Sequence, residues 1–521
     1  MRKFVGTSDD ALMIACTALA STLIYLAASS YLRLELNAVS YRLQLFRSYY
    51  EKFGWPDLFP AAVSGVGLIQ LVILGTVCAI FGLLVRWLFY PGSGGGLVVL
   101  VYGFAAALVP PLFVAAVLWP DGQGRLGTLA LLALSVGFTG VLALAFIRRL
   151  RARAREAAQI EATTDVERSR FRFLVLVPLL PLMALVWWCG VSALQGFDSW
   201  SYHVPLAAHW LTDSSLYRGP EVSLTDFYPG NFELLVRWLL ALGSPNYVFV
   251  VALIGGVLSV YVIYRICLEL EHTETAALIA AACAGSCAVM VNLMATAYSD
   301  TMASLFTLVA VFLLLRWLRT REPVLLVALG TSLGLAAGTK YTALPVAVLI
   351  VATVAWHLLP SVKAESNSTP IRGLTALLLA AVICSGYWYI RNAIEHGNPV
   401  FRVGMVALPG VSMDYLVPPK PGLPASPLHY LFLPWREFGF TGRYYDDGIG
   451  LMFAAIALPA FILMPMLDSW RSRRPAVALW LITVVLFAQW LSTGSLYARF
   501  GLIPILLTGS ARPGLALAHP C

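Results

Sequence analysis

Long runs of apolar residues, separated by short polar loops, are the feature that most constrains how this chain can fold. Most of these runs are 17–25 residues long, which suits helices that cross about 30 Å of hydrocarbon. Charged residues make up only 12% of the chain, whereas a soluble domain carries about 25%. No alternating ten-residue pattern indicates a barrel, so backbone hydrogen bonding in lipid requires helices. The sequence therefore predicts an all-α polytopic membrane protein.

The charged loops predict how the chain is oriented. We predict membrane spans over 10–31, 60–86, 96–119, 126–148, 172–194, 244–268, 274–294, 300–318, 322–338, 341–358, 371–391, 449–467, 475–492 and 496–511. The arginine-rich loops 148–172, 316–323 and 468–475 then share one side, which the positive-inside rule makes cytoplasmic. The net charge of +8 is explained by such loops, and we do not expect nucleic-acid binding. The loops around Asp198 and Lys340 consequently face the outside.

A polar stretch rich in alanine, arginine and glutamate divides the chain. Residues 151–171 are typical of a cytoplasmic basic linker, between a four-span N-terminal membrane module over 1–150 and a larger membrane module over 172–521. The larger module has two long outer loops, 195–243 and 392–448. In the first of these loops, "VPLAAHWL" and "NFELLVRWLLAL" predict short helices that lie at the membrane interface.

The eight cysteines do not form a recognisable framework. Seven of them fall in or beside apolar spans, and no Cys-x-x-Cys or Cys/His metal spacing occurs. We expect neither disulfides nor a metal centre built from these residues. Whether a divalent cation assists the chemistry is left open by the sequence.

The stretch "GFDSWSYHVPLAAHW" places ionisable and aromatic side chains together just beyond a predicted span. Asp198 lies there close to Tyr202 and His203. A partly buried carboxylate within reach of a hydroxyl group can act as a general base. The same residue also fits the N-cap of a short helix.

Two further acids lie on the same predicted face. Glu233 falls in "DFYPGNFELL", and Asp300 opens an apolar span in "YSDTMASLF". Each is a candidate second acid. The alternative for Asp300 is simple stabilisation of a helix N-terminus, where the helix dipole favours a negative charge.

Cations at two outer helix ends are candidate phosphate contacts. Lys340 and Tyr341 occupy the turn in "GTKYTAL", and Arg499 lies in "YARFGLIP". An ammonium group binds phosphate as a point charge, and a guanidinium binds it with two parallel hydrogen bonds. Arg391 and Asn392 lie at a third such end, in "WYIRNAIEHGNPVF".

These motifs, taken in their order along the chain, resemble the GT-C superfamily of membrane glycosyltransferases. The segments are "FDSWSYHVPLAAHWL", "YPGNFELL", "YSDTMASLF", "GTKYTAL", "WYIRNAIEHGNPVF" and "YARFGLIP". The superfamily includes the protein O-mannosyltransferases and the aminoarabinose transferases of lipid A. The resemblance covers about 172–510 and leaves the first four predicted spans outside it.

The resemblance implies a helical bundle of the GT-C type, with interfacial helices on its outer face, and an inverting hexosyl- or pentosyltransferase activity. The donor would be a sugar on a polyprenyl phosphate, and the acceptor a glycan, lipid or protein. The site would face the periplasm or exterior from the plasma (inner) membrane. Asp198 matches the position of the general base. The residues expected to bind substrate or donor phosphate are Lys340, Arg499, Tyr341, Tyr202 and His203.

Other classes of protein remain as alternatives. A surface-polysaccharide polymerase or ligase shares the polyprenyl chemistry and relies on a large outer loop rich in arginine and histidine, which 392–448 resembles in part. A lipid-linked sugar transporter or flippase would place ionisable residues in the middle of the membrane. A non-catalytic membrane scaffold would need no cluster of charges on the outer face.

Overall fold

The structure is a computed structural model, and it describes part of the chain. The described residues are 97–98, 100–105, 107–109, 186, 196, 198–212, 216, 227–241, 247–365, 369–401, 474–492 and 507. Of the interpretable residues, 86% are helical and none lies in a strand, which confirms the predicted all-α class.

The structure describes twelve helical segments with defined bounds, in the following order along the chain. They are the π-helical turn η2 (Ser199–His203), α7 (Val204–Thr212), α8 (Asn231–Ala241), α9 (Phe249–Glu269), α10 (Glu274–Gly285), α11 (Ala288–Met294), α12 (Asp300–Thr320), α13 (Val324–Ala337), the 3-10 turn η5 (Tyr341–Ala343), α14 (Leu344–Glu365), α15 (Thr369–His396) and α19 (Arg474–Ser492). Within the described residues, four segments are long and apolar enough to cross a membrane: Phe249–Glu269, Asp300–Thr320, Tyr341–Leu358 and Pro370–His396.

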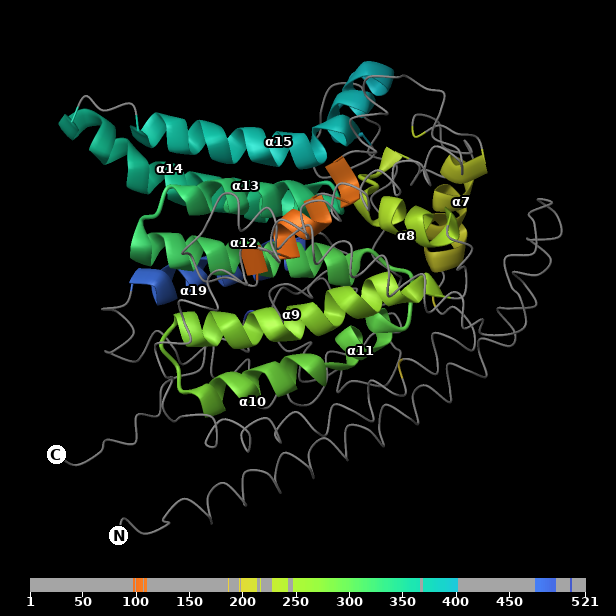
Figure 1. The fold of residues 1–521 in the computed structure, drawn as a ribbon, viewed down its shortest axis with the longest axis horizontal. Helices are drawn as coiled ribbons and strands as arrows, with labels where there is room; N and C mark the ends of the chain where they lie inside the picture. The colour runs from red at the N-terminus through yellow and green to blue at the C-terminus, as the bar shows by residue number, and fades with distance from the viewer. Residues whose placement is uncertain are drawn as a thin grey trace, which may run out of the picture.

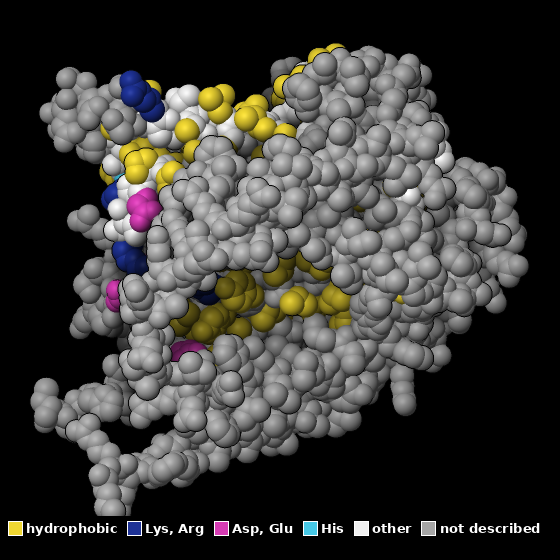
Figure 2. All heavy atoms as spheres, viewed as in Figure 1, with side chains coloured by type: hydrophobic (Ala, Val, Ile, Leu, Met, Phe, Trp, Pro, Cys, Tyr) yellow, Lys and Arg dark blue, Asp and Glu magenta, His cyan; other side chains and the backbone are white. Residues whose placement is uncertain are grey.

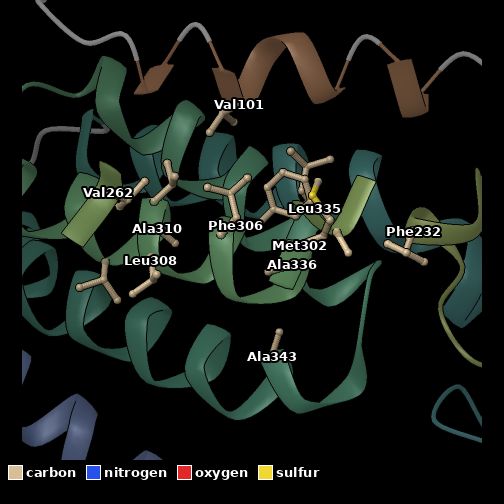
Figure 3. Close-up of a cluster of buried hydrophobic side chains, with 14 of the residues drawn as sticks. Val101, Phe232, Val262, Met302, Phe306, Leu308, Ala310, Leu335, Ala336 and Ala343 are labelled. Atoms are coloured by element: carbon tan, nitrogen blue, oxygen red, sulfur yellow. The ribbon is translucent and has the colours of Figure 1, made fainter. Parts of the chain in front are cut away.

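The helix α12 is the centre of the bundle. It packs along α9 on one side and α13 on the other, while α10 covers α9 and α15 covers α13 (Figure 1). Within its most apolar stretch 89% of the residues are buried, against 22% in Tyr341–Leu358. Figure 3 shows this core, where Phe306 and Leu308 of α12 lie among side chains of the neighbouring helices. The protein interior is thus built around α12, and α14 lies at its edge.

A stripe of small residues lets α13 and α15 approach closely. A Cβ atom at Gly330 would lie 2.0 Å from the carbonyl oxygen of Leu377, and one at Gly334 would lie 2.3 Å from that of Ala381. Because these neighbours are backbone atoms, they cannot rotate away. Small residues spaced by four are a common means of helix association in membranes, where packing rather than water drives contact.

An ion pair shows which loops share an end of the bundle. Arg319 near the end of α12 lies 2.8 Å from Glu269 at the end of α9, so the turns after these two helices are neighbours. On the face shown in Figure 2, the charged side chains of described residues lie mainly toward the left edge, and the described side chains visible in the middle are mostly apolar. The opposite end of the bundle carries α7 and α8 (Figure 1).

The predicted spans 244–268, 300–318, 341–358 and 371–391 correspond to apolar helices of the structure. The prediction of one helix over 274–294 is wrong. The chain leaves helical geometry after Gly285, and Cys287 is extended before α11 begins. The predicted span 322–338 is a helix of only 14 residues, or about 21 Å.

Part of the N-terminal region packs into this bundle. Helical residues between 97 and 109 contribute Leu97, Val101 and Leu108 to the buried core. The indole Nε1–H of Trp238 in α8 donates to the carbonyl oxygen of Ala107 at 3.1 Å. The module boundaries predicted at 150 and 171 lie outside the described residues and stay a prediction.

Candidate active site

Asp198 is held at the start of a widened helical turn. It precedes η2, in which the N–H of Val204 bonds to the carbonyl oxygen of Ser199. Pro205 gives a local reason for this widening, because a proline has no N–H and its ring clashes with the carbonyl four residues earlier in a regular α-helix. Turns of this kind are rare and often lie at functional sites.

The carboxylate of Asp198 does not cap the helix that follows. No side-chain cap hydrogen bond is formed at this position, so the capping interpretation of Asp198 is not supported. Its backbone N–H donates to the phenol oxygen of Tyr298 at 3.1 Å. The hydroxyl of Ser199 accepts from the N–H of Ala297 at 3.0 Å. The two bonds attach the beginning of η2 to the loop that leads into α12.

Lys340 forms an ion pair with Asp300. Its Nζ lies 2.7 Å from the Oδ1 atom of Asp300, forty residues away in sequence. The side chain of Asp300 is 5% exposed and that of Lys340 is 19% exposed. No side-chain cap bond forms at Ser299, which precedes α12. The pair brings the candidate second acid and the candidate phosphate contact together.

His203 and Glu233 form a second buried pair. The Nδ1–H of His203 donates to Oε1 of Glu233 at 2.5 Å, and their side chains are 2% and 5% exposed. The ring of His203 also lies against Phe232 and Tyr298. This pair joins the end of η2 to α8.

Tyr341 and Asn392 connect the turn after Lys340 to the end of α15. The amide of Asn392 donates to the phenol oxygen of Tyr341 at 2.8 Å. The Tyr341 hydroxyl donates to the carbonyl of Phe227 at 3.2 Å. Arg391 is buried there, with its Nη2 atom 3.1 Å from Oδ1 of Asn392 and its guanidinium 5.1 Å from the Trp388 ring centre.

A row of aromatic rings links the Asp198 turn to the Lys340 turn. The ring of Tyr202 contacts those of His203 and Tyr228, and Tyr228 contacts Tyr341. Centroid separations in this row run from 4.0 to 6.5 Å, so neighbouring rings are in contact. The structure thus gathers at one end the predicted residues Asp198, Tyr202, His203, Glu233, Asp300, Lys340 and Tyr341.

Some predicted features cannot be placed in this way. Arg499 and the loop 402–448 lie outside the described residues. No group of three or more histidine, cysteine, aspartate or glutamate side chains that could hold a metal ion occurs in the part of the chain that the structure describes.

Asn231 is a residue of the candidate loop whose role proves to be structural. It is fully buried, and its amide donates to the carbonyl oxygen of Cys384 at 3.0 Å while accepting from the indole of Trp388 at 2.8 Å. Its backbone N–H donates to the carbonyl oxygen of Gly338. It therefore fastens α8 to α13 and α15.

Arg391 is the residue whose environment sequence reasoning underestimated. Its position in "YWYIRNAIEH" shows only a cation near a helix end. The sequence did contain a signal of burial, because aromatic residues and an asparagine flank this arginine on an apolar helix. Such neighbours can contact a buried guanidinium group.

The described helices thus form a bundle that carries two acids and a cation at one end. Residues 234–390 match the family model described as dolichyl-phosphate-mannose-protein mannosyltransferase, a glycosyltransferase family of the GT-C type. The match covers α9 to α13 completely and contains Asp300, Lys340 and Tyr341. Over this segment the chain is similar to that family, which supports a membrane glycosyltransferase of the GT-C type. No curated protein and no solved structure matched the chain.

Proposed function

We propose that this protein transfers a sugar from a polyprenyl-phosphate donor to an acceptor hydroxyl on the extracytoplasmic side of the plasma membrane. The observation that carries the proposal is the convergence of Asp198, Asp300 and Lys340 at one end of the bundle. Tyr298 is the connection, since it accepts from the N–H of Asp198 and lies two residues before Asp300, which binds Lys340.

The proposed reaction is a single displacement. The carboxylate of Asp198 takes the proton from the acceptor hydroxyl, and the oxygen attacks the anomeric carbon. The bond from that carbon to the phosphate oxygen breaks, its electron pair stays on the phosphate, and the anomeric configuration is inverted. Lys340 stabilises the negative charge of the leaving polyprenyl phosphate. An ammonium group has three donors, so its bond to Asp300 is compatible with a phosphate contact.

Among the other residues predicted to bind the donor are Tyr202, Tyr341 and Arg499. Tyr202 and Tyr341 belong to the aromatic row between the two turns, and in the proposed complex they pack against a sugar ring. Arg499 stays a proposed phosphate contact on the strength of its sequence position. The family name speaks of mannose and of protein, and mannose is accordingly the first donor sugar to test.

The described helices α12 and α13 offer no support for the transporter or flippase alternative. In the described helices α12 and α13, no charged residue lies between Thr301 and Leu315 or between Val324 and Ala337. A transporter is expected to place ionisable groups at that depth. The polymerase or ligase alternative depends on the loop 392–448 and is distinguished by its product, a lengthened or transferred glycan chain.

The test is turnover of a panel of polyprenyl-phosphate hexoses and pentoses by purified protein, with an envelope fraction of the producing cells as acceptor. We expect one donor to be consumed, a product of inverted configuration by NMR, and a loss of about 10²–10⁴-fold in Asp198→Asn. Glu269→Gln is the matched control, because it alters a buried carboxylate at the other end of the bundle. Full turnover by Asp198→Asn would remove that residue as the base.

A further inference from the structure

We propose that the buried pair His203–Glu233 positions Asp198, so that neither residue of the pair touches the substrate. The inference rests on the proposed function, because it takes Asp198 as the general base. It assigns to His203 and Glu233 a role different from the donor contact and second acid expected from the sequence.

The pair completes the attachment of η2 to the rest of the protein. Hydrogen bonds at Asp198 and Ser199 fix the beginning of this turn to residues 297–298. The bond from His203 to Glu233 fixes its end to α8. Since α8 is itself fastened through Asn231 to α13 and α15, the end of the turn is tied to the interior of the bundle.

The π-helical geometry couples the two ends of η2. Its hydrogen bonds join residues five apart, as the bond from the Val204 N–H to the Ser199 carbonyl oxygen does, so residues at this spacing lie closer to one side of the turn than they would in an α-helix. Asp198 and His203 are five residues apart. In the proposed role, a displacement of the His203 ring rotates the turn on which the Asp198 carboxylate is carried.

Stability alone does not account for an ionisable pair at this place. The Oε2 atom of Glu233 is buried and has no hydrogen-bond partner in the part of the chain that the structure describes. A buried polar atom without a partner is unfavourable, and apolar residues of similar volume often replace a buried ion pair without loss of stability. A role in orienting the neighbouring turn explains why the directional bond is present.

The experiment uses the full chain in lipid nanodiscs with polyprenyl-phosphate mannose, or with the member of the donor panel that the wild type consumes fastest. The first variant, His203→Phe/Glu233→Leu, replaces the pair by apolar side chains and keeps an aromatic ring beside Phe232 and Tyr298. We expect its Tm to stay near that of the wild type, its KM for the donor to change less than threefold, and its kcat to fall about 10²-fold, as for a misplaced catalytic group.

Two further variants separate positioning from chemistry. Glu233→Gln keeps an oxygen that accepts from His203, and we expect it to retain kcat within about tenfold. A second acid would lose its function on this substitution, and Gln would then be as damaging as Leu. Adding His203→Phe/Glu233→Leu to Asp198→Asn should lower kcat no further, because residues that act through one group are not additive.

The outcomes are distinguishable. Wild-type kcat in the apolar double variant, or equal damage from Glu233→Gln and the double variant, would overturn the positioning role while leaving Asp198 as the base. A multiplied loss in the triple variant would also overturn it, because the pair would then act independently of Asp198. Wild-type turnover by Asp198→Asn would instead refute the proposed function, and the positioning of a base with it. If the double variant does not fold, His203→Asn with Glu233 intact provides the same comparison of kcat with KM.

Discussion

The side chains of Lys340 and Asp300 differ in solvent exposure. This difference predicts which substitution lowers the free energy of unfolding less. In Lys340→Met, the Asp300 carboxylate, 5% exposed, loses its ion-pair partner. We expect a loss of about 3 kcal/mol in the free energy of unfolding. In Asp300→Asn, the ammonium group of Lys340 can turn toward water, and we expect a loss of about 1 kcal/mol. Thermal unfolding in detergent measures both. Equal losses would show that the two ends of the pair are equally enclosed.

The sequence predicted which residues lie near one another at one end of the protein, but it did not predict their ion-pair and hydrogen-bond partners. The order of spans and loops predicts that Asp198, Asp300 and Lys340 share one face, and the structure gathers them at one end. The pairs Lys340–Asp300 and His203–Glu233 join residues 40 and 30 positions apart, and they depend on how helices pack. The polarity of Asn231 is visible in the sequence, but its buried partners Gly338, Cys384 and Trp388 are not.

At the scale of helices, Pro205 should matter for activity more than for stability. In Pro205→Ala the clash that favours the widened turn is removed, and an alanine is a better helix former in a helix interior by about 3 kcal/mol. We expect a Tm equal to or above that of the wild type and a turnover reduced about tenfold, because Asp198 is rotated by the change of register. Circular dichroism melting and donor turnover provide the two readings. Unaltered turnover would mean that the register of η2 does not orient the carboxylate.

The close contact of α13 with α15 leads to a second prediction about helices. Gly330→Ala brings a methyl group against the backbone of Leu377, so we expect a loss of about 3 kcal/mol or more and little folded protein. Gly386→Ala is the control, because there the nearest atom is a side-chain carbon of Val382 at 3.0 Å. Yield and Tm from size-exclusion chromatography and melting compare the two. A Gly330→Ala protein as stable as Gly386→Ala would show that α13 and α15 lie further apart.

The sequence predicted helices correctly where a long apolar run is enough to define the span. The spans predicted over 244–268 and 300–318 differ from α9 and α12 by a few residues at their ends. The break between α10 and α11 was missed because the apolar composition continues through Gly285 and Ser286, and hydropathy does not report backbone geometry. The π-helical register of η2 was missed for a related reason, since Pro205 also fits the first turn of an ordinary helix.

At the scale of the whole molecule, the N-terminal region and the bundle are physically connected. Phe104 packs edge-on against Phe306 of α12 at 5.2 Å, and Trp238 binds the backbone at Ala107. We expect a chain that begins at residue 151 to unfold at a lower temperature than the full chain, or to aggregate, because it exposes the apolar face that residues 97–109 cover. Fluorescence-detected size-exclusion chromatography measures this. An equal Tm for the two chains would show that the N-terminal region contributes nothing to the bundle.

The central claim is that one end of this bundle binds the donor phosphate beside Lys340, with the anomeric carbon facing Asp198. The most direct measurement is an electron cryo-microscopy structure of Asp198→Asn in nanodiscs with bound polyprenyl-phosphate mannose. We predict phosphate density within about 3 Å of the Lys340 ammonium and the sugar between that density and residue 198. Density at the opposite end, beside Arg319 and Glu269, or within the apolar middle of the bundle, would contradict the account.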